Sequence, residues 1–201
     1  MLQPLLSDGK PVQHVSSDEA YDFNKYLDWV DSTTIGLGQV PADAYVDRVP
    51  SLAKDWIKSP LAVRNIKSSN LDHLYWPPQA HAYSEKAIHA LSWCFDKEGE
   101  VVNLPCKGRE DLYFFHLRTI ADVLDTELSN LHWVGIFASP IYEYVFRFPI
   151  DWDHHIFYLQ QDMVTHYVTD KFKKCVEENN LTGFVFKKVW SRQSHCHQAS
   201  L

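Results

Sequence analysis

The sequence contains little glycine and lacks the glycine patterns of phosphate-binding and hydrolytic sites. Only 7 of the 201 residues are glycine. Nucleotide-binding enzymes place glycine where the backbone must approach a phosphate group. The sequence has no P-loop, no G-x-G-x-x-G and no G-x-S-x-G pattern, and no further glycine or lysine follows Gly36-Leu37-Gly38 to complete a phosphate cradle. These absences disfavour an enzyme.

Long apolar runs and paired cysteines are also missing. No window approaches the roughly 18 uninterrupted apolar residues of a membrane span, and the N-terminus MLQPLLSDGKP lacks the basic start and apolar stretch of a secretory signal. The four cysteines lie far apart without paired spacing, so we interpret them as reduced thiols: Cys94, Cys106, Cys175 and Cys196. We therefore expect a cytoplasmic protein.

Basic residues are outnumbered by acidic ones. The chain has 19 Lys and Arg against 26 Asp and Glu, a formal net charge of −7. Direct binding of nucleic acid is disfavoured, because phosphate contacts need clustered Lys and Arg. Residues 1–31 hold six acids and two lysines. Such a run could steer a basic partner or simply form a solvated helix face.

Aromatic and other apolar residues are plentiful. The sequence has 7 Trp, 10 Tyr and 11 Phe, and 45% of it is hydrophobic. Such rings fill cores, and Tyr and Trp also anchor protein interfaces. The length favours one domain over residues 1–201, within which 1–98 could form an N-terminal lobe, 99–192 the better-defined part and 193–201 a flexible tail.

The N-terminal half gives sparse structural signals. Ser16 and Glu19 form a capping box that predicts a helix over Ser17–Val30. Prolines interrupt residues 41–78, where Leu52–Ile57 indicates a helical turn and Ala62–Ile66 a strand, and which could pack as a sublobe or wrap the main sheet. Ser84 predicts the cap of a helix that reaches Phe95, with Ile88, Leu91 and Phe95 on its buried side.

The C-terminal half is typical of antiparallel strands. A short helix is predicted from Thr119, with Asp122 at its capping-box position. Thr169 is predicted to cap a last helix that ends near Asn179–Asn180 and buries Phe172, Cys175 and Val176. The predicted strands are Glu100–Leu104, Asp111–Leu117, Leu131–Phe137, Tyr142–Phe148, Ile156–Leu159, Val164–Val168 and Phe184–Trp190. The fold class is α+β: a mostly antiparallel sheet with a few helices packed on it and a C-terminal strand–helix–strand unit.

Two clusters invite a metal hypothesis. His195 and His197, with Cys196 between them, would share one side of a strand, but they follow the last predicted strand, where a frayed tail is expected. The run from Asp151 to His155 contains two carboxylates and two imidazoles. Its spacing matches no ligand pattern, so a polar surface turn is the simpler interpretation. We expect no metal and no cofactor.

Two stretches resemble the immunity protein eleven domain family of bacterial polymorphic-toxin systems. The first runs from Asp111-Leu112-Tyr113-Phe114-Phe115-His116-Leu117 into the D-x-x-D pattern of Asp122 and Asp125, and the second covers residues 168–174 and 181–190, including Leu181-Thr182-Gly183. The resemblance implies an immunity protein kept in the cytoplasm, which neutralises a cognate toxin by stoichiometric binding. It implies no catalytic residue, because the family's recurring residues build the fold.

Candidate toxin contacts combine aromatic and acidic side chains. They are Tyr142, Glu143, Tyr144, Asp151, Trp152 and Asp153. A nuclease toxin would offer such residues a basic cleft. Two alternatives remain: a small metal-dependent enzyme that uses Asp151, Asp153, His154 and His155, and a non-catalytic accessory protein of a secretion system.

Overall fold

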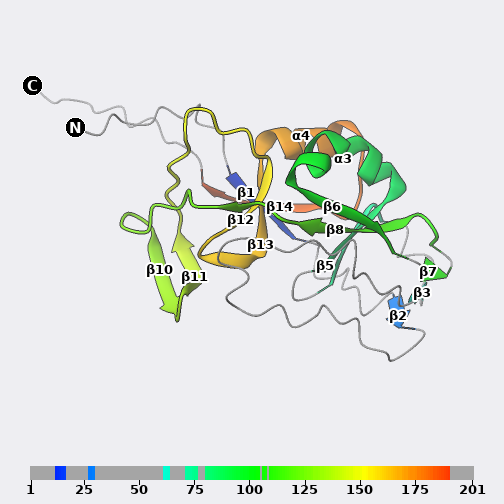
Figure 1. Cartoon of the computed structure of the whole chain (residues 1–201), viewed down its shortest axis with the longest axis horizontal. Helices are drawn as coiled ribbons and strands as arrows, with labels where there is room; N and C mark the ends of the chain where they lie inside the picture. Colours follow the sequence, from blue (N-terminus) through cyan, green and yellow to red (C-terminus); the bar gives the residue numbers. More distant parts are fainter. Residues whose placement is uncertain are drawn as a thin grey trace, which may run out of the picture.

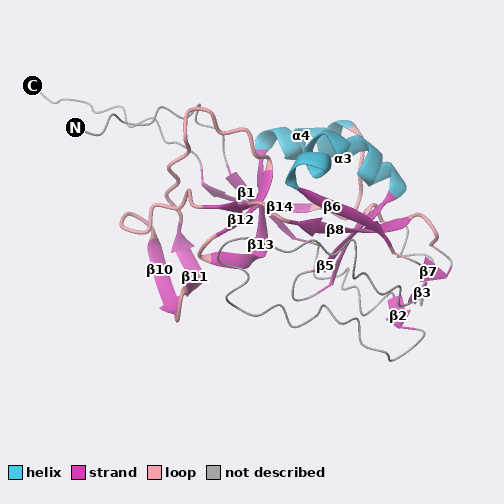
Figure 2. Cartoon of the chain, viewed as in Figure 1, coloured by secondary structure: helices cyan, strands magenta, loops and turns pink. Residues whose placement is uncertain are grey.

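The computed structural model describes residues 12–16, 27–29, 61–63, 71–76, 80–104, 106–107 and 109–190. In this part of the chain, helices α3 (Glu85–Glu98) and α4 (Asp170–Glu178) lie side by side against the same side of the strands (Figures 1 and 2). No helix within the described ranges has the length and apolarity needed to cross a bilayer. The predicted α+β class, with mostly antiparallel strands, is confirmed.

Strands form two larger sheets. The five-stranded sheet has the order β14-β1-β13-β12-β9 and contains β1 (Val12–Ser16), β9 (Ile120–Ala121), β12 (Ile156–Leu159), β13 (Asp162–Thr169) and β14 (Val185–Trp190). The four-stranded sheet has the order β4-β5-β8-β6 and contains β4 (His73–Trp76), β5 (Ala80–Ser84), β6 (Gly99–Asn103) and β8 (Leu112–Leu117). All neighbours in these sheets are antiparallel except β9 and β12.

Two smaller sheets complete the described strands. One has the order β2-β3-β7 and contains β2 (Leu27–Trp29), β3 (Leu61–Val63) and β7 (Cys106–Lys107). The other is a hairpin of β10 (Asn130–Val134) and β11 (Phe137–Glu143), which lies at the side of the molecule away from α3 (Figure 1).

The predicted cap of α3 is confirmed. The Ser84 hydroxyl oxygen accepts a hydrogen bond of 3.1 Å from the Ala87 amide, so it satisfies one of the free amides at the helix start. The helix buries Leu91 and Phe95, and the ring of Phe95 stacks on Phe115 of β8 with centroids 4.0 Å apart. At Gly99 a Cβ would collide with the Phe115 ring and the His116 carbonyl, so the chain leaves the helix close against β8.

The main hydrophobic cluster joins both larger sheets to both helices. Its largest members come from β5, α3, β8, β12 and α4. Helix α4 contributes Phe172 and Val176 as predicted, whereas Cys175 is only half-buried. A second cluster is formed by buried side chains from residues 121–167 and includes Phe146, Phe157 and Tyr167. Burial of rings of this size supplies much of the apolar stabilisation of the fold.

Three buried histidines form a chain through this core. Nδ1 of His73 lies 3.1 Å from the Gly183 carbonyl oxygen, and its Nε2 lies 2.9 Å from Nδ1 of His81. His81 stacks on His166 with ring centroids 3.7 Å apart, and Nε2 of His166 lies 3.1 Å from the Tyr158 hydroxyl. Because a carbonyl can only accept, Nδ1 of His73 carries the proton and its Nε2 accepts from His81. Burial lowers the pKa of His73 to about 4, so its ring is neutral at neutral pH.

The predicted helix from Thr119 is wrong. Residues Ile120 and Ala121 form β9 and pair in parallel with Tyr158 and Leu159 of β12. The Thr119 hydroxyl donates a hydrogen bond of 2.7 Å to the buried carboxylate of Glu98 instead of capping a helix. Bonds to residues distant in the sequence therefore override the local capping pattern.

Other predicted boundaries shift. Leu27–Trp29 is a strand, which contradicts the end of the helix predicted over Ser17–Val30. The strand predicted over Leu131–Phe137 is broken by a turn, in which Gly135 has a φ of 65°. The strand predicted over Tyr142–Phe148 ends at Glu143, because β11 begins earlier. The predicted strand Ala62–Ile66 appears in part as β3, while the turn at Leu52–Ile57, the rest of 41–70 and the tail 193–201 lie outside the described residues.

The C-terminal strand–helix–strand unit is confirmed as β13, α4 and β14. Thr169 occupies the cap position with extended backbone, and Asp170 begins the helix as predicted. The Thr169 hydroxyl makes no capping bond and instead lies 2.9 Å from Nδ1 of His155. The helix stops at Glu178, and Gly183 adopts a φ of 85° in the turn that leads to β14.

Candidate functional site

Three of the predicted contact residues lie at the end of β11, and two of them face solvent. Tyr142 is 66% exposed and Glu143 is exposed, whereas Tyr144 turns toward the core. The Tyr144 hydroxyl lies 3.3 Å from that of Tyr167, and burial raises the pKa of Tyr144. Tyr142 and Glu143 are therefore available to a partner, and Tyr144 supports them from below.

The hairpin exposes further apolar side chains that the sequence analysis did not select. Trp133 is 48%, Val134 58% and Ile136 63% exposed, and Leu128 precedes them in an equally open position. Residues 128–142 supply five of the nine large exposed apolar side chains in the described part of the chain. The same fifteen residues contain no Asp, Glu, Lys or Arg, a signal that was available in the sequence.

The opposite side of the hairpin is fixed to the body. Leu131 and Ile141 pack on the second hydrophobic cluster, and Phe137 packs on the main one. The Ala138 amide donates a hydrogen bond of 2.8 Å to the Gln161 carbonyl at the β12–β13 turn. The exposed face is thus presented by a strand pair that is held in place.

The chain that leads into the hairpin is ordered by Asp125. One oxygen of its buried carboxylate accepts hydrogen bonds of 3.2 Å from the amides of Glu127 and Leu128, and the other forms an ion pair with Arg147. The Ser129 hydroxyl accepts a hydrogen bond of 2.9 Å from the Val145 amide. These bonds fix the base of the hairpin, where Asn130 lies opposite Glu143.

The other predicted contacts lie in the turn before β12. Asp151 and Asp153 are exposed, but Trp152 is half-buried, with its ring against Phe148 and Phe157 at centroid distances of 5.2 and 5.3 Å. Asp153 forms an ion pair of 2.7 Å with Lys97, and that hydrogen bond lowers the pKa of Asp153. The turn is therefore tied to α3, and Trp152 is largely a packing residue.

An aromatic ladder connects the two groups of predicted contacts. Ring centroids of Tyr144 and Phe146 are 6.0 Å apart, those of Phe146 and Phe148 5.4 Å, and those of Phe148 and Trp152 5.2 Å. Rings at these distances pack favourably. The four rings thus form one packed row between the hairpin and the turn, while Ile150 between them is exposed.

The four residues of the alternative metal site are engaged mainly by other groups, although Nε2 of His155 also lies 3.5 Å from a carboxylate oxygen of Asp153. Nδ1 of His154 lies 2.8 Å from the buried Glu98 carboxylate, while His155 bonds to Thr169 and Asp153 to Lys97. Asp151 is exposed in the turn. Among the residues that the structure describes, no group of three His, Cys, Asp or Glu side chains converges in a metal-binding arrangement. His195, Cys196 and His197 lie outside those residues.

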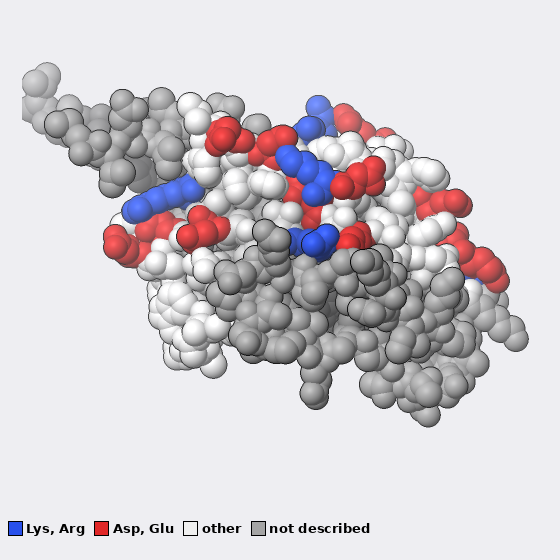
Figure 3. All heavy atoms as spheres, viewed as in Figure 1, with Lys and Arg blue, Asp and Glu red and all other residues white. Residues whose placement is uncertain are grey.

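Charge is unevenly distributed around the hairpin. Figure 3 shows its free end without acidic or basic side chains, whereas charged groups gather near its base. Glu127 and Glu143 flank the uncharged stretch in the sequence, and Arg147 is paired with Asp125. The surface is thus an apolar projection with an acidic border.

The C-terminal half of the chain matches a known protein family. Residues 105–191 match the Immunity protein family (Imm11), a segment that covers β7 to β14 and includes the hairpin, the aromatic ladder and the C-terminal unit. No curated protein matches the chain. The chain therefore carries an Imm11 immunity protein family domain, which spans residues 105–191.

Proposed function

We propose that this protein is the antidote to a cognate bacterial toxin and neutralises it by stoichiometric binding. The family match over residues 105–191 is the observation that carries the proposal. Such a function requires a rigid surface that can exclude water from an interface, and it requires no bond-making chemistry. The anchored hairpin with its exposed Trp133 and Tyr142 has these properties.

The charge of the chain supports a basic partner. A net charge of −7 accelerates association with a positively charged surface and disfavours binding to like-charged proteins. A toxin that acts on nucleic acid has a basic active-site cleft, and an acidic protein would compete for it. We place the encounter in the cytoplasm, where such a toxin meets its target.

The test is rescue and direct binding with the toxin encoded beside this protein. Co-expression should restore growth of cells that produce the toxin, and calorimetry should give a one-to-one complex with nanomolar affinity. An unrelated toxin of the same net charge is the control, and it should give neither rescue nor heat. Failure of the neighbouring toxin to bind would refute the proposal.

A further inference from the structure

The hairpin exposes more apolar surface than its own packing requires. Leu131, Phe137 and Ile141 already provide the contacts that hold it on the body. Monomeric proteins rarely expose a large contiguous apolar patch unless it binds something. We call the exposed apolar side chains of this stretch, residues 128–142, the hairpin face. They are Leu128, Trp133, Val134, Ile136 and Tyr142.

The hairpin face is preorganised. The register of β10 and β11 pairs Trp133 with Ala138 and Val134 with Phe137. Both partners in β11 anchor the strand, Ala138 through its hydrogen bond to Gln161 and Phe137 through its contact with the main hydrophobic cluster. The Asp125 carboxylate fixes the preceding turn. Because the backbone is already ordered, little conformational entropy is lost when a partner covers the face.

The border of the hairpin face decides between two occupants. Glu127 and Glu143 flank it, and the nearby Arg147 is engaged by the buried carboxylate of Asp125. A second copy of the chain, packed hairpin to hairpin, would bring these glutamates toward their equivalents and be repelled. A partner with basic side chains around an apolar site would be attracted.

We propose that the hairpin face is the main toxin-contact surface, and that it inserts into an apolar slot on the toxin whose border is basic. This inference rests on the proposed function and specifies where and how binding occurs. Trp133 is the main anchor, because a half-exposed Trp in a stretch with other exposed apolar side chains has the composition of an interface hot spot. The slot excludes water from the apolar residues, while Glu127 and Glu143 pair with its basic border.

The experiment compares variants by calorimetry against the toxin encoded beside this protein. Trp133→Ala and Val134→Ser should each weaken binding, the first by at least about 30-fold. Val185→Ser is the matched control, since Val185 is also exposed on a strand, at 39%, but lies on β14. Each variant must melt at the wild-type temperature before its affinity is compared. Val185→Ser should bind as the wild type does.

A second measurement tests the basic border. The Glu127→Gln and Glu143→Gln double variant should associate more slowly with the toxin and respond less to added salt, because charge steers association. If the salt dependence of association were unchanged in the double variant, the proposed pairing of Glu127 and Glu143 with a basic border on the toxin would be wrong.

The outcomes separate the two proposals. If the wild type binds and Trp133→Ala and Val134→Ser bind equally well, the hairpin inference is wrong and the proposed function stands. If the wild type gives no heat with the toxin, the proposed function itself is refuted. A wild-type dimer in sedimentation that Trp133→Ala converts to monomers would assign the hairpin face to a second copy and overturn the inference.

Discussion

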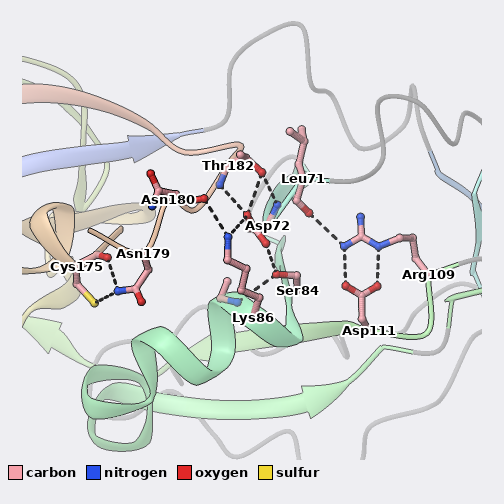
Figure 4. A network of polar contacts seen from close by, with 11 residues as sticks. Leu71, Asp72, Ser84, Lys86, Arg109, Asp111, Cys175, Asn179, Asn180 and Thr182 are labelled. Carbon is pink, nitrogen blue, oxygen red and sulfur yellow. Dashed lines mark hydrogen bonds and ion pairs between the residues drawn. The ribbon is translucent and has the colours of Figure 1, made fainter. Parts of the chain in front are cut away.

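Replacement of Asp72 by alanine should destabilise the whole fold, because its carboxylate joins two distant parts of the chain. One oxygen accepts a hydrogen bond of 2.7 Å from the Ser84 hydroxyl at the cap of α3. The other accepts bonds of 2.8 and 3.0 Å from the amide and hydroxyl of Thr182, in the turn after α4 (Figure 4). Lys86 lies 3.8 Å from the same oxygen. The network therefore connects the starts of β4 and α3 to residues 110 positions away.

The expected loss is about 2–3 kcal/mol, summed over these contacts. The buried Ser84 hydroxyl would lose its only hydrogen-bond acceptor among the described residues, which costs about 1–2 kcal/mol. Thr182 is exposed, so water replaces its lost acceptor and the cost there is about 1 kcal/mol. Lys86 adds little, because its side chain is 57% exposed. For a chain of this length the melting temperature should fall by about 5–10 °C.

Urea denaturation followed by tryptophan fluorescence measures the effect. Asp72→Asn should lose about half as much stability as Asp72→Ala, because its amide oxygen can still accept on one side, whereas its amide nitrogen cannot accept hydrogen bonds. Asp96→Ala, at an exposed position on α3, is the control and should change the free energy of unfolding by less than about 0.5 kcal/mol. Wild-type stability of Asp72→Asn or Asp72→Ala would refute the reasoning.

The pH dependence of this effect has a defined sign. Burial alone would raise the pKa of Asp72, but hydrogen bonds from Ser84 and Thr182, with Lys86 nearby, leave it below its ordinary value of 3.8. The ionised carboxylate therefore contributes stability that is complete above pH 3.8 and is lost as the pH falls through the folded-state pKa. The difference between wild type and Asp72→Ala should be full at pH 7 and shrink at strongly acidic pH.

Three further predictions concern the core. Burial lowers the pKa of His73 from 6.5 to about 4. Between these two pH values the unfolded chain takes up a proton that the folded chain does not. The free energy of unfolding should therefore fall by about 3 kcal/mol through this residue as the pH falls from 6.5 to 4. Urea titrations at several pH values test this: His73→Gln should flatten the profile, and a profile as steep as that of the wild type would contradict the reasoning. Gly183→Ala should destabilise the fold by more than about 2 kcal/mol, because its Cβ would collide with the His73 carbonyl. Gly135→Ala should cost less, because a Cβ there lies in open space and adds only the strain of a positive φ. Equal melting temperatures for the two variants would contradict this prediction. Trp152→Ala should cost about 2–3 kcal/mol in thermal unfolding because the ring packs on the aromatic ladder, and an unchanged melting temperature would show that the ring does not support the fold.

Elements whose signals are local could be predicted from the sequence. The cap at Ser84 and the start of the last helix after Thr169 depend on residues within one turn, and both helices begin where the pattern indicates. Ile156–Leu159 is a strand with the predicted bounds, since four consecutive apolar residues between polar segments can be buried on both faces.

Elements that depend on distant partners could not be predicted. The segment after Thr119 has a helical capping pattern, yet its hydroxyl bonds to Glu98, 21 positions away, and β9 pairs with β12. The hairpin turn at Gly135 was hidden because apolar residues continue through it without a polar break. In each case the deciding contact is a tertiary one, which a local pattern does not contain.

At the candidate site, too, residue type could be predicted from the sequence, whereas burial depended on tertiary contacts. Tyr142 and Glu143 were selected for residue type and are exposed, whereas Tyr144 and Trp152 were selected for the same reason and are half-buried. Trp133 and Ile136 were overlooked because an apolar residue in a strand is usually buried. Alternation along β10 does not reveal that only Leu131 faces the body, since the register shifts on both sides of that residue.

The hairpin separates the residues that hold the fold from those that are exposed to solvent. Leu131, Ala138 and Ile141 fix its position, and their replacement would disturb the core beneath. Trp133 and Ile136 are exposed, so substitutions there should cost little folding stability and would act on the interface that we propose. A protein that must recognise one toxin and ignore its relatives needs such a division, because specificity depends on both favourable and repulsive contacts at the surface. Within the matched family segment, the uncharged stretch of residues 128–142 carries both the contacts that anchor the hairpin and the exposed side chains that we propose for toxin contact.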